Sequence, residues 1–302
     1  MGGIVLDRFR LLKRSRDHGG ITAIVLGPMG TGKTTFLLSK LVIPLLRRRE
    51  EVLIWRGGAF CQWGYLEPSR VRLLLVEECR YRFIDRRTGE THKPLDLPHS
   101  LGVYEVLYIG YPSHVLEHAK PGFLNVVYCS DLFFIEMLEE LNERPDIRWV
   151  SVFHDEVQKL APSNVEDHMW KRNKRLADAL ADTRKNYVSF YCTAHDLSDV
   201  DYRVARKMMY RVYLRDARIP RDSIIKNKML SYKLRLGEAI VEGGRFKLTR
   251  FQPLQKQLDL VVKIRPWTIS ALPSEKSEEL EDGSDAEMMD LSLLEGAWDD
   301  RL

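Results

Sequence analysis

The residues best suited to chemistry form a glycine-rich loop near the start of the sequence. The pattern G-x-x-x-x-G-K-T is met by Gly27, Pro28, Met29, Gly30, Thr31, Gly32, Lys33 and Thr34, with Thr35 next. Glycines let the backbone curl so that successive N–H groups point at one phosphate. In such a loop the lysine reaches the β- and γ-phosphates, and the hydroxyl after it holds Mg²⁺. The pattern therefore predicts ATP bound with Mg²⁺, with Lys33 on the phosphates and Thr34 on the metal.

The residues around the loop predict the elements that must position it. The apolar run from Ile21 to Leu26 predicts a buried strand that leads into the loop. A helix starting at Gly32 would point its positive dipole end at the same phosphate. The alternative is a glycine-rich turn that matches by chance. The strand–loop–helix order favours the phosphate-binding loop.

An acidic pair follows a second apolar strand. The run from Trp149 to Phe153 leads into Asp155 and Glu156. In an open α/β sheet, ligands bind at the carboxyl ends of the strands. Asp155 would contact Mg²⁺, directly or through a water, and Glu156 would be the base that orients the attacking water. The alternative is an acidic pair at a strand end with no catalytic role.

Three further residues flank this predicted site. Thr193 ends the next predicted strand, at 187–192, where a polar group can contact the γ-phosphate or the water. An ordinary turn or cap threonine is the alternative for that position. His154 and His195 also lie beside the site, although histidines in such places are more often packing residues than ligands.

A multimeric ATPase also needs a cation from the neighbouring subunit, which contributes on the order of 10³–10⁵ in rate. The candidates for this arginine finger all follow the acidic pair: Arg184, Arg203, Arg206, Arg211 and Arg215. A surface arginine without such a role is the alternative for each of them.

Strand and helix patterns alternate around the loop, which predicts an α/β fold. The expected class is a RecA-like P-loop NTPase, with a mainly parallel sheet flanked by helices. Pro44 should bend or end the first helix. Residues 56–125 have the pattern of β hairpins inserted between core elements, and Gly243-Gly244 predicts the turn of a later hairpin.

The 302 residues divide into four predicted regions. Residues 1–20 form a basic N-terminal arm, and residues 21–220 form the P-loop ATPase domain with the insertion at about 56–125. Residues 221–270 form a β-rich C-terminal extension. The acidic, Ser-containing residues 271–302 predict a disordered tail.

The charge is distributed unevenly along the sequence. Residues 271–302 carry 11 acidic and 2 basic residues, whereas residues 1–270 carry 45 basic and 32 acidic residues. A basic body favours contact with nucleic acid or another anionic surface. A solvated basic surface with a solubilising tail is the alternative.

The cysteines and the apolar runs predict the compartment. The four cysteines (Cys61, Cys79, Cys129 and Cys192) are scattered, without C-x-x-C or histidine at ligand spacing. A disulfide framework or zinc site is therefore not expected, and a reducing cytoplasm fits, that of a host if the protein is viral. No run approaches the roughly 20 apolar residues that a membrane span needs.

Three segments together resemble the FtsK/HerA superfamily of P-loop ATPases: Gly27–Thr35, Trp149–Pro162 and Arg184–Thr193. That superfamily includes double-stranded DNA pumps, viral genome-packaging ATPases and conjugation motors. The resemblance implies a homo-oligomeric ring, a hexamer, that acts on double-stranded DNA. The stretch Leu41–Trp55 is similar to the Zot-like branch, whose members serve virus assembly, usually with a membrane anchor. No anchor segment is recognised here, which favours the motor.

The resemblance also implies roles for single residues. The Walker B strand of the superfamily ends in Asp-Glu, as at Asp155 and Glu156, and its next strand ends in Thr-Gln. This sequence has Thr193 but Ala194 in place of the glutamine, so Thr193 acts alone or His195 substitutes. Arg184 matches the arginine before that strand and is the preferred trans-acting candidate.

Three functions remain open from the sequence. The first is an ATP-driven motor that translocates or packages double-stranded DNA of a virus or mobile element. The second is a Zot-like assembly or secretion ATPase, or a nucleotide-switched assembly protein, that docks a capsid or secretion component. The third is a small-molecule kinase, which the glutamate after Asp155 and the basic body argue against.

Overall fold

The computed structural model describes residues 11–12, 19–48, 51–144 and 148–266. Most of the predicted N-terminal arm and all of the predicted acidic tail lie outside these residues. The described residues all belong to one compact unit, so the described part of the predicted C-terminal extension belongs to the same body as the loop.

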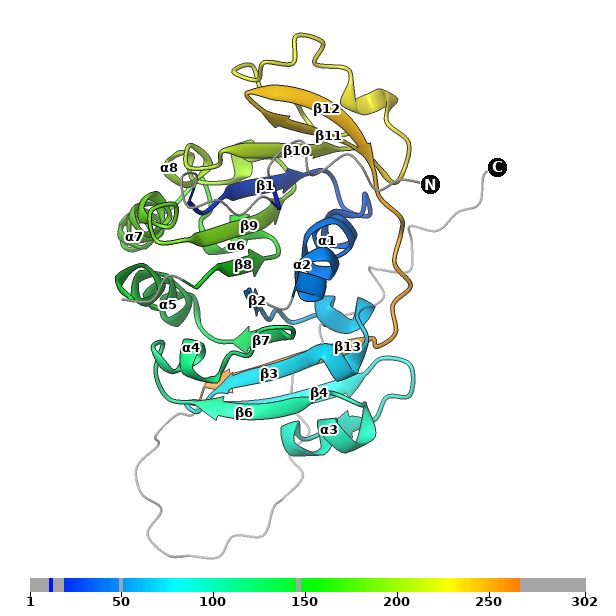
Figure 1. Cartoon of the computed structure of the whole chain (residues 1–302), viewed down its shortest axis with the longest axis vertical. Helices are drawn as coiled ribbons and strands as arrows, with labels where there is room; N and C mark the ends of the chain where they lie inside the picture. The colour runs from blue at the N-terminus through cyan, green and yellow to red at the C-terminus, as the bar shows by residue number, and fades with distance from the viewer. Residues whose placement is uncertain (1–10, 13–18, 49–50, 145–147, 267–302) are drawn as a thin grey trace, which may run out of the picture. The chain divides into compact units, whose positions relative to one another are not determined.

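A sheet of ten strands runs through this unit in the order β12-β11-β10-β1-β9-β8-β2-β7-β3-β6 (Figure 1). The eight strands from β10 to β6 are parallel: β10 (Tyr210–Leu214), β1 (Thr22–Leu26), β9 (Val188–Ala194), β8 (Val150–His154), β2 (Val52–Arg56), β7 (Leu124–Tyr128), β3 (Val71–Val76) and β6 (Glu105–Ile109). The hairpin of β11 (Glu238–Gly243) and β12 (Arg245–Arg250) continues the sheet beyond β10.

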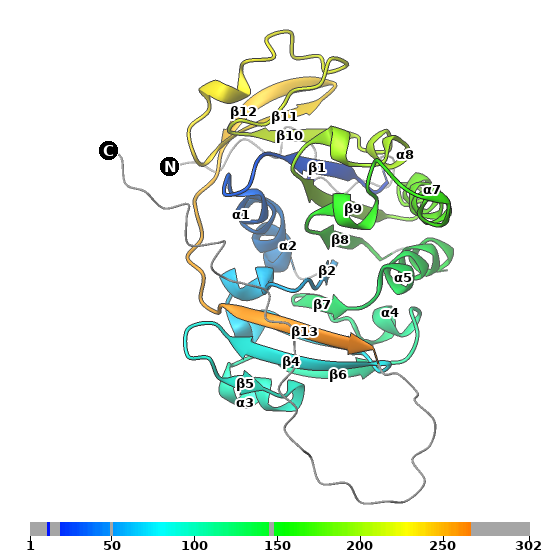
Figure 2. The same cartoon turned by 180° about the vertical axis from the view of Figure 1, so that it is seen from behind.

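The central strands are buried on both faces, which explains their continuous apolar runs. Helices cover both sides of the sheet, with α1 and α2 on one side and α5, α7 and α8 on the other (Figures 1 and 2). The bounds of the helices on the second side are α5 (Asp131–Glu143), α6 (Val157–Leu160), α7 (Asp167–Asp182) and α8 (Tyr202–Ala205). The predicted mainly parallel α/β fold is therefore confirmed.

The first helix does not end at Pro44, which was one of the two outcomes predicted for that proline. Helix α1 (Lys33–Leu37) passes through a π-helical turn, η2 (Leu38–Val42), and continues as α2 (Ile43–Arg48). The wider turn precedes the proline, which has no N–H to donate to the preceding turn. Pro44 therefore does not end the helix, which continues for one more turn.

Residues 56–125 also differ from the prediction. Strands β3, β6 and β7 of this region are parallel members of the main sheet, so it is not simply an insertion of hairpins. The hairpin of β4 (Cys79–Asp85) and β5 (Thr91–His92) is the antiparallel part that the sequence predicted. Three 3-10 turns and two short helices connect these strands: η3 (Gln62–Tyr65), η4 (Pro68–Arg70), η5 (Pro94–Asp96), α3 (Leu97–Ser100) and α4 (His114–His118).

A second, three-stranded sheet joins distant parts of the sequence. Strand β13 (Leu260–Pro266) pairs antiparallel with β4, in the order β13-β4-β5. The segment from β12 to β13 runs past α1 and α2 (Figure 1). On the way, Gln257 N donates to Gly64 O at 2.7 Å, and the Phe251 ring contacts the Phe36 ring of α1 at 5.4 Å between centroids. The C-terminal segment therefore packs against the helix that begins at the phosphate-binding loop.

Candidate nucleotide site

The glycine-rich loop leaves β1 and enters α1 with a backbone that only glycines adopt easily. Gly30 and Gly32 have φ angles of 78° and 90°. A Cβ on Gly27 would lie 2.6 Å from Thr31 Oγ1, which donates to Pro28 O at 2.8 Å. Met29, at the tip of the loop, is 83% exposed. The tip is therefore open to solvent while its base is closely packed.

Lys33 folds back onto its own loop. Its Nζ donates to the carbonyl oxygens of Gly27 and Pro28 at 2.8 and 3.0 Å. Burial lowers the pKa of Lys33, and the nearby charges of Asp155 and Glu156 offset part of that effect. The loop carbonyls thus hold the ammonium where phosphate oxygens would be the stronger acceptors.

Thr34 and Asp155 meet at the carboxyl ends of β1 and β8. Thr34 Oγ1 donates to Asp155 Oδ2 at 2.9 Å, and Thr193 Oγ1 donates to Asp155 Oδ1 at 2.6 Å. Burial raises the pKa of Asp155, while both hydrogen bonds favour its ionised form. Strand β9 lies between β1 and β8, which is why Thr193 reaches this carboxylate.

Glu156 has the left-handed backbone conformation, with φ 57° and ψ 58°. This conformation directs its N–H to Thr193 Oγ1 at 2.8 Å. Its carboxylate contacts Lys159 Nζ at 2.5 Å and His195 Nε2 at 3.3 Å. Burial raises the pKa of Glu156, but the hydrogen bond and charge of Lys159, with the charge of Lys33, outweigh it and give a net lowering. Glu156 is therefore held as an ionised carboxylate.

His195 links the loop lysine to the second carboxylate. Lys33 Nζ lies 3.1 Å from its Nδ1. Because an ammonium only donates, Nδ1 is the acceptor and the ring proton sits on Nε2, which faces Glu156. The His195 ring therefore bridges the two groups.

The structure thus brings together Lys33, Thr34, Asp155, Glu156 and Thr193, as the sequence predicted. Thr35 is half-buried in the first turn of α1. Arg184 lies away from these residues in the structure. It precedes β9, and its carbonyl accepts a hydrogen bond from Gly20 N, just before β1. Those positions are at the amino edge of the sheet, opposite the loop, so Arg184 does not join the site of its own chain.

The other candidate arginines differ in their ion pairs. Arg203 pairs with Asp201 through two hydrogen bonds of 2.9 and 2.6 Å. Arg211 pairs with Asp222 at 2.8 Å, and Arg215 lies 3.2 Å from Asp216. Arg206 has no ion pair among the described residues.

Sequence reasoning did not find a polar cluster beside the site. Arg56, at the end of β2, donates to His154 Nε2 at 2.6 Å and pairs with Asp131, which also accepts from Arg172 at 2.8 Å. Burial lowers the pKa of His154 well below its usual range, and the charge of Arg56 adds to this. A basic residue at a strand end next to a histidine is too common a pattern to have predicted the cluster.

Lys159 and Phe251 were also missed. Lys159 follows Glu156 by three residues on α6, a spacing that places the two side chains on one helix face. Phe251 is far from α1 along the sequence, yet a Cβ on Gly32 would meet its ring at 3.1 Å. The first could have been found from spacing, but the second depends on the tertiary structure.

Within the described residues, no group of three or more His, Cys, Asp or Glu side chains could hold a metal ion by itself. The candidate Mg²⁺ ligands, Thr34 and Asp155, are a hydroxyl and a single carboxylate. All four cysteines are described and are free thiols. No helix in the described ranges is both long and apolar enough to cross a membrane.

No family model and no curated protein matches the chain. Among solved structures, the genome packaging NTPase B204 from Sulfolobus turreted icosahedral virus 2, in complex with AMPPCP, has a TM-score of 0.47 and 12% identity. That match covers 80% of this chain and 100% of B204. The bacterial conjugative coupling protein TrwBdeltaN70 has a TM-score of 0.49 and 12% identity, over 85% of this chain and 93% of that chain.

A third similar structure is the N-terminal domain of zonular occludens toxin from Neisseria meningitidis. Its TM-score is 0.30 at 12% identity, over 81% of this chain and 94% of that domain. Because each TM-score is below 0.5, the fold assignment rests on the strand order and loop geometry of this chain.

Two features of this chain carry that assignment. Strand β9 lies between the strand that precedes the glycine-rich loop and the strand that ends at Asp155. The loop, the carboxylates and Thr193 then meet at one carboxyl edge of a mainly parallel sheet. The chain therefore has the fold of the RecA-like P-loop NTPases.

Proposed function

We propose that the chain is an ATP-hydrolysing motor that translocates or packages double-stranded DNA of a virus or mobile element. One observation carries the enzymatic part of the proposal. Thr34 and Asp155 share a hydrogen bond of 2.9 Å at the mouth of the glycine-rich loop, within one network with Lys33, Glu156 and Thr193. The loop lysine, the proposed Mg²⁺ ligands and the proposed base thus lie together at one edge of the sheet.

The residues present fit a nucleotide with Mg²⁺. The Thr34 hydroxyl and the Asp155 carboxylate are hard oxygen donors, the ligand type that Mg²⁺ takes, and their oxygens are already adjacent. They would hold the ion together with phosphate oxygens, and Thr193 keeps the carboxylate in place. When bound, the ion neutralises charge on the β- and γ-phosphates.

The remaining residues have separable roles. The loop from Gly27 to Gly32 presents backbone N–H groups to the phosphates. Lys33 exchanges its loop carbonyls for phosphate oxygens, which are stronger, charged acceptors. Glu156, held ionised by Lys159, accepts the proton of the attacking water. His195 contacts both Lys33 and Glu156 and holds the two side chains in place relative to each other.

The motor is proposed to act as a homo-oligomeric ring, a hexamer, with an arginine in trans. Arg184 remains the preferred residue, because its place at the amino edge keeps it away from the site of its own chain. Arg206 is the second candidate, because it has no ion pair among the described residues.

Double-stranded DNA is the proposed substrate track, and the basic body of residues 1–270 supports this. The neighbour B204 is a genome packaging NTPase by name, in agreement with such a role. The second candidate is a Zot-like assembly ATPase or a nucleotide-switched protein that docks a capsid or secretion component.

The deciding experiment is ATP hydrolysis by the purified full chain, with and without long double-stranded DNA, over a salt series. Lys33→Ala serves as the blank. We expect strong stimulation by DNA that fades as salt rises, because phosphate contacts release counterions. Hydrolysis that ignores DNA would refute the motor and favour the assembly protein.

A further inference from the structure

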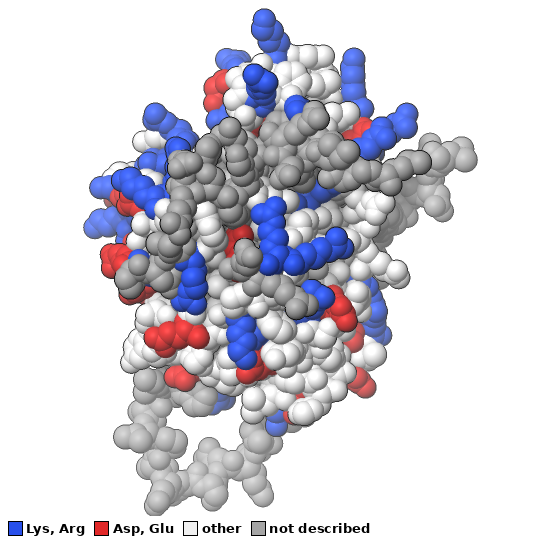
Figure 3. Space-filling model, in the orientation of Figure 1, with Lys and Arg blue, Asp and Glu red and all other residues white. Residues whose placement is uncertain are grey.

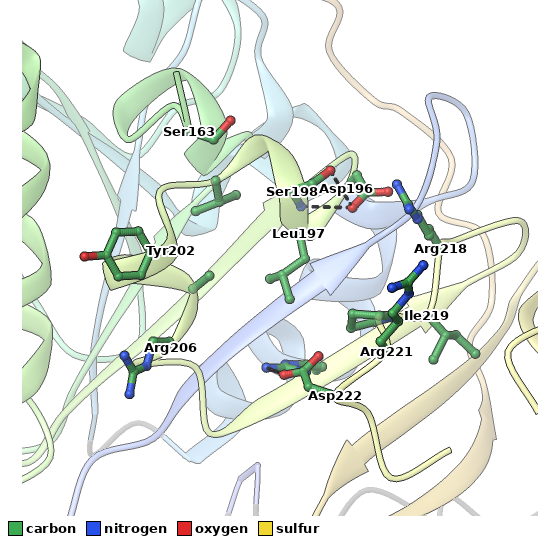
Figure 4. A pocket seen from close by; sticks show the side chains of 14 residues that line it. Ser163, Asp196, Leu197, Ser198, Tyr202, Arg206, Arg218, Ile219, Arg221 and Asp222 are labelled. Carbon is green, nitrogen blue, oxygen red and sulfur yellow. Dashed lines mark hydrogen bonds and ion pairs between the residues drawn. The ribbon is translucent and has the colours of Figure 1, made fainter. Parts of the chain in front are cut away.

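Two adjoining hollows surround helix α8. The first, of about 520 Å³, lies between the loop after β9, α8 and the loop after β10 (Figure 4). The second, of about 510 Å³, lies between α7 and α8. Both are lined by Tyr202 and Arg206, so they form one continuous surface. We call this the α8 surface.

The α8 surface carries an excess of cations without a carboxylate partner in the described part of the chain. Three carboxylates line the two hollows. Asp222 pairs with Arg211, Asp196 accepts from Ser198 in its own turn, and the charge of Asp178 acts on Arg203. Five cations of the two hollows have no ion pair among the described residues: Lys174, Arg206, Lys207, Arg218 and Arg221. Lys and Arg side chains gather over the part of the molecule where α7 and α8 lie, with some Asp and Glu among them (Figure 3).

The unpaired arginines stand around the first hollow. Arg206 and Tyr202 lie on one side of it, and Arg218 and Arg221 lie on the other (Figure 4). Arg206, Arg218 and Arg221 are all exposed. An extended anion with several charges can therefore meet cations from both sides.

Aromatic rings are exposed on the same surface. Trp170 is 47% exposed and Tyr202 is 67% exposed. The Arg203 guanidinium lies over the Trp170 ring at 4.5 Å, and Lys174 lies 5.9 Å from the same ring. Cations interleaved with exposed aromatic rings are typical of nucleic-acid surfaces.

Two arginines of α7 pair with α5 and do not contribute to the α8 surface. Arg175 is bound to Glu139 of α5 by hydrogen bonds of 3.1 and 2.6 Å, and Arg172 is bound to Asp131. These two arginines hold α7 against α5. Lys174 is the basic residue of α7 that lines the second hollow.

The α8 surface is connected to the nucleotide site through the backbone. Asp196, in the lining, directly follows His195, which contacts Lys33 and Glu156. The loop before α8 also pairs with the loop after α6, through the Pro162–Val200 bridge and the hydrogen bond from Asp201 N to Ala161 O at 2.9 Å. A ligand on this surface would therefore act on both segments that carry the site.

We propose that the α8 surface binds the phosphate backbone of duplex DNA, and that this binding couples DNA to ATP turnover through the segment from His195 to Asp201. The proposal rests on the proposed function. The recognition is by charge and not by base sequence, because the cations are exposed and lie around an open hollow. A neighbouring copy of the chain is the competing occupant.

The test compares two triple variants of the full chain with equal reduction of charge. The first is Lys174→Ala with Arg218→Ala and Arg221→Ala, three exposed cations of the α8 surface that are not candidates for the trans-acting arginine. The matched control removes three exposed cations from the second sheet and its surroundings, in Arg82→Ala with Lys93→Ala and Lys263→Ala. Binding to a fluorescent duplex of random sequence is measured over a KCl series, together with ATP hydrolysis with and without that duplex.

We expect the first variant to lower the slope of log K against log salt by about 0.9 for each phosphate that is no longer neutralised, or about 2.7 for three. Stimulation of hydrolysis by DNA should fall with it, while hydrolysis without DNA stays at the wild-type rate. The control should keep both the slope and the stimulation.

Equal reductions in both variants would overturn the proposal, because general charge would then explain binding. Unchanged DNA binding in the first variant would also overturn it, and a changed sedimentation coefficient in that case would assign the surface to a neighbouring copy. If the wild-type chain itself ignores DNA, the proposed function fails and not only this surface.

Discussion

Two polar clusters at opposite edges of the sheet use the same kinds of side chain in different ways. At the amino edge, Arg72 is 1% exposed and donates to Glu105 at 2.9 and 2.7 Å, to the His118 carbonyl, and to Asn125 at 3.2 Å. The Asn125 amide donates in turn to Leu53 O at 2.9 Å. At the carboxyl edge, the cluster is the one around Lys33, Asp155 and Glu156.

The difference lies in what each donor holds. The partners of Arg72 belong to the frame of the sheet, and no ligand can replace them. Lys33, in contrast, donates to the glycine-rich loop that a phosphate would occupy, and Thr34 donates to the carboxylate that a metal would share. The paired charge of Arg72 at the amino edge stabilises the fold. Under the proposed function, the same kinds of side chain at the carboxyl edge exchange their protein partners for a phosphate or a metal ion.

The largest expected effect is at the carboxyl edge. Glu156→Gln should lower kcat for ATP by about 10²–10⁴, because the amide cannot accept the proton of water. ATP affinity and unfolding free energy should stay close to wild type. Hydrolysis rates and binding of a fluorescent ATP analogue measure this. Normal turnover by the variant would remove Glu156 as the base.

At the amino edge, Arg72→Ala should lower the stability of the fold and leave the chemistry unchanged. Removing Arg72 takes the side-chain donor from the His118 carbonyl and leaves Glu105 with its weaker contact to Lys120 at 3.6 Å, so the unfolding free energy should drop by about 3 kcal/mol. That value is at the low end because the Glu105 side chain is 32% exposed. Urea denaturation measures it, with Arg70→Ala, an exposed arginine 3.9 Å from Glu67, as the control. The rate per folded molecule should not change, and a specific loss of turnover would contradict the comparison.

Variants of His195 test whether its contacts with Lys33 and Glu156 position those two residues for hydrolysis. His195→Ala should lower kcat about tenfold, the equivalent of one hydrogen bond of about 1.4 kcal/mol, with little change in KM. His195→Gln should restore most of the rate, because its amide accepts from Lys33 and donates to Glu156. A glutamine variant as slow as the alanine variant would show that the bridge has no positioning role.

The smallest expected effect concerns His154, which lies next to Asp155 but is fixed by Arg56 like the amino-edge residues. Its folded pKa is lowered, by burial first and then by Arg56, so below pH 6.5 the unfolded chain binds a proton that the folded chain refuses. Stability from this group is therefore lost as the pH falls below 6.5. At pH 5.5 the loss should be about 1.4 kcal/mol.

That loss is measured by urea denaturation of the wild-type chain and of His154→Gln, both without Mg²⁺, at pH 7.5 and 5.5. The variant should lose about 1.4 kcal/mol less than wild type between the two values. Equal losses would mean that His154 is protonated in the fold and belongs with the exchangeable residues.

Several features were predictable because neighbouring residues fix them. Ser130 accepts from Phe133 N at 3.2 Å and begins α5 as its residue type predicts. The hairpin of β11 and β12 turns at Gly244, with φ 68°. In contrast, the pairing of β13 with β4 joins Leu260 to Asp85, and no local pattern in either strand predicts its partner. The pairing of β3, β6 and β7 within the main sheet is also not encoded by any local pattern, which is why residues 56–125 were expected to be an insertion.

The candidate site divides in the same way. Local sequence patterns alone predicted Lys33, Thr34, Asp155 and Glu156. Each proposed role needs a particular residue type at a fixed distance from the glycine-rich loop or from the end of a strand. The contact of His195 with both Lys33 and Glu156 was not predictable, since it requires β9 to lie between β1 and β8.

The sequence by itself determined the glycine-rich loop, the alternation of strands and helices, and the acidic pair at a strand end. These depend on backbone angles, hydrogen bonds and apolar periodicity within a few residues. The tertiary structure decided the strand order, the ion pairs of Arg203 and Arg211, the contact of Phe251 with α1 and the cations left around α8. Those depend on which apolar faces are buried together, a property of the whole chain that no short segment contains.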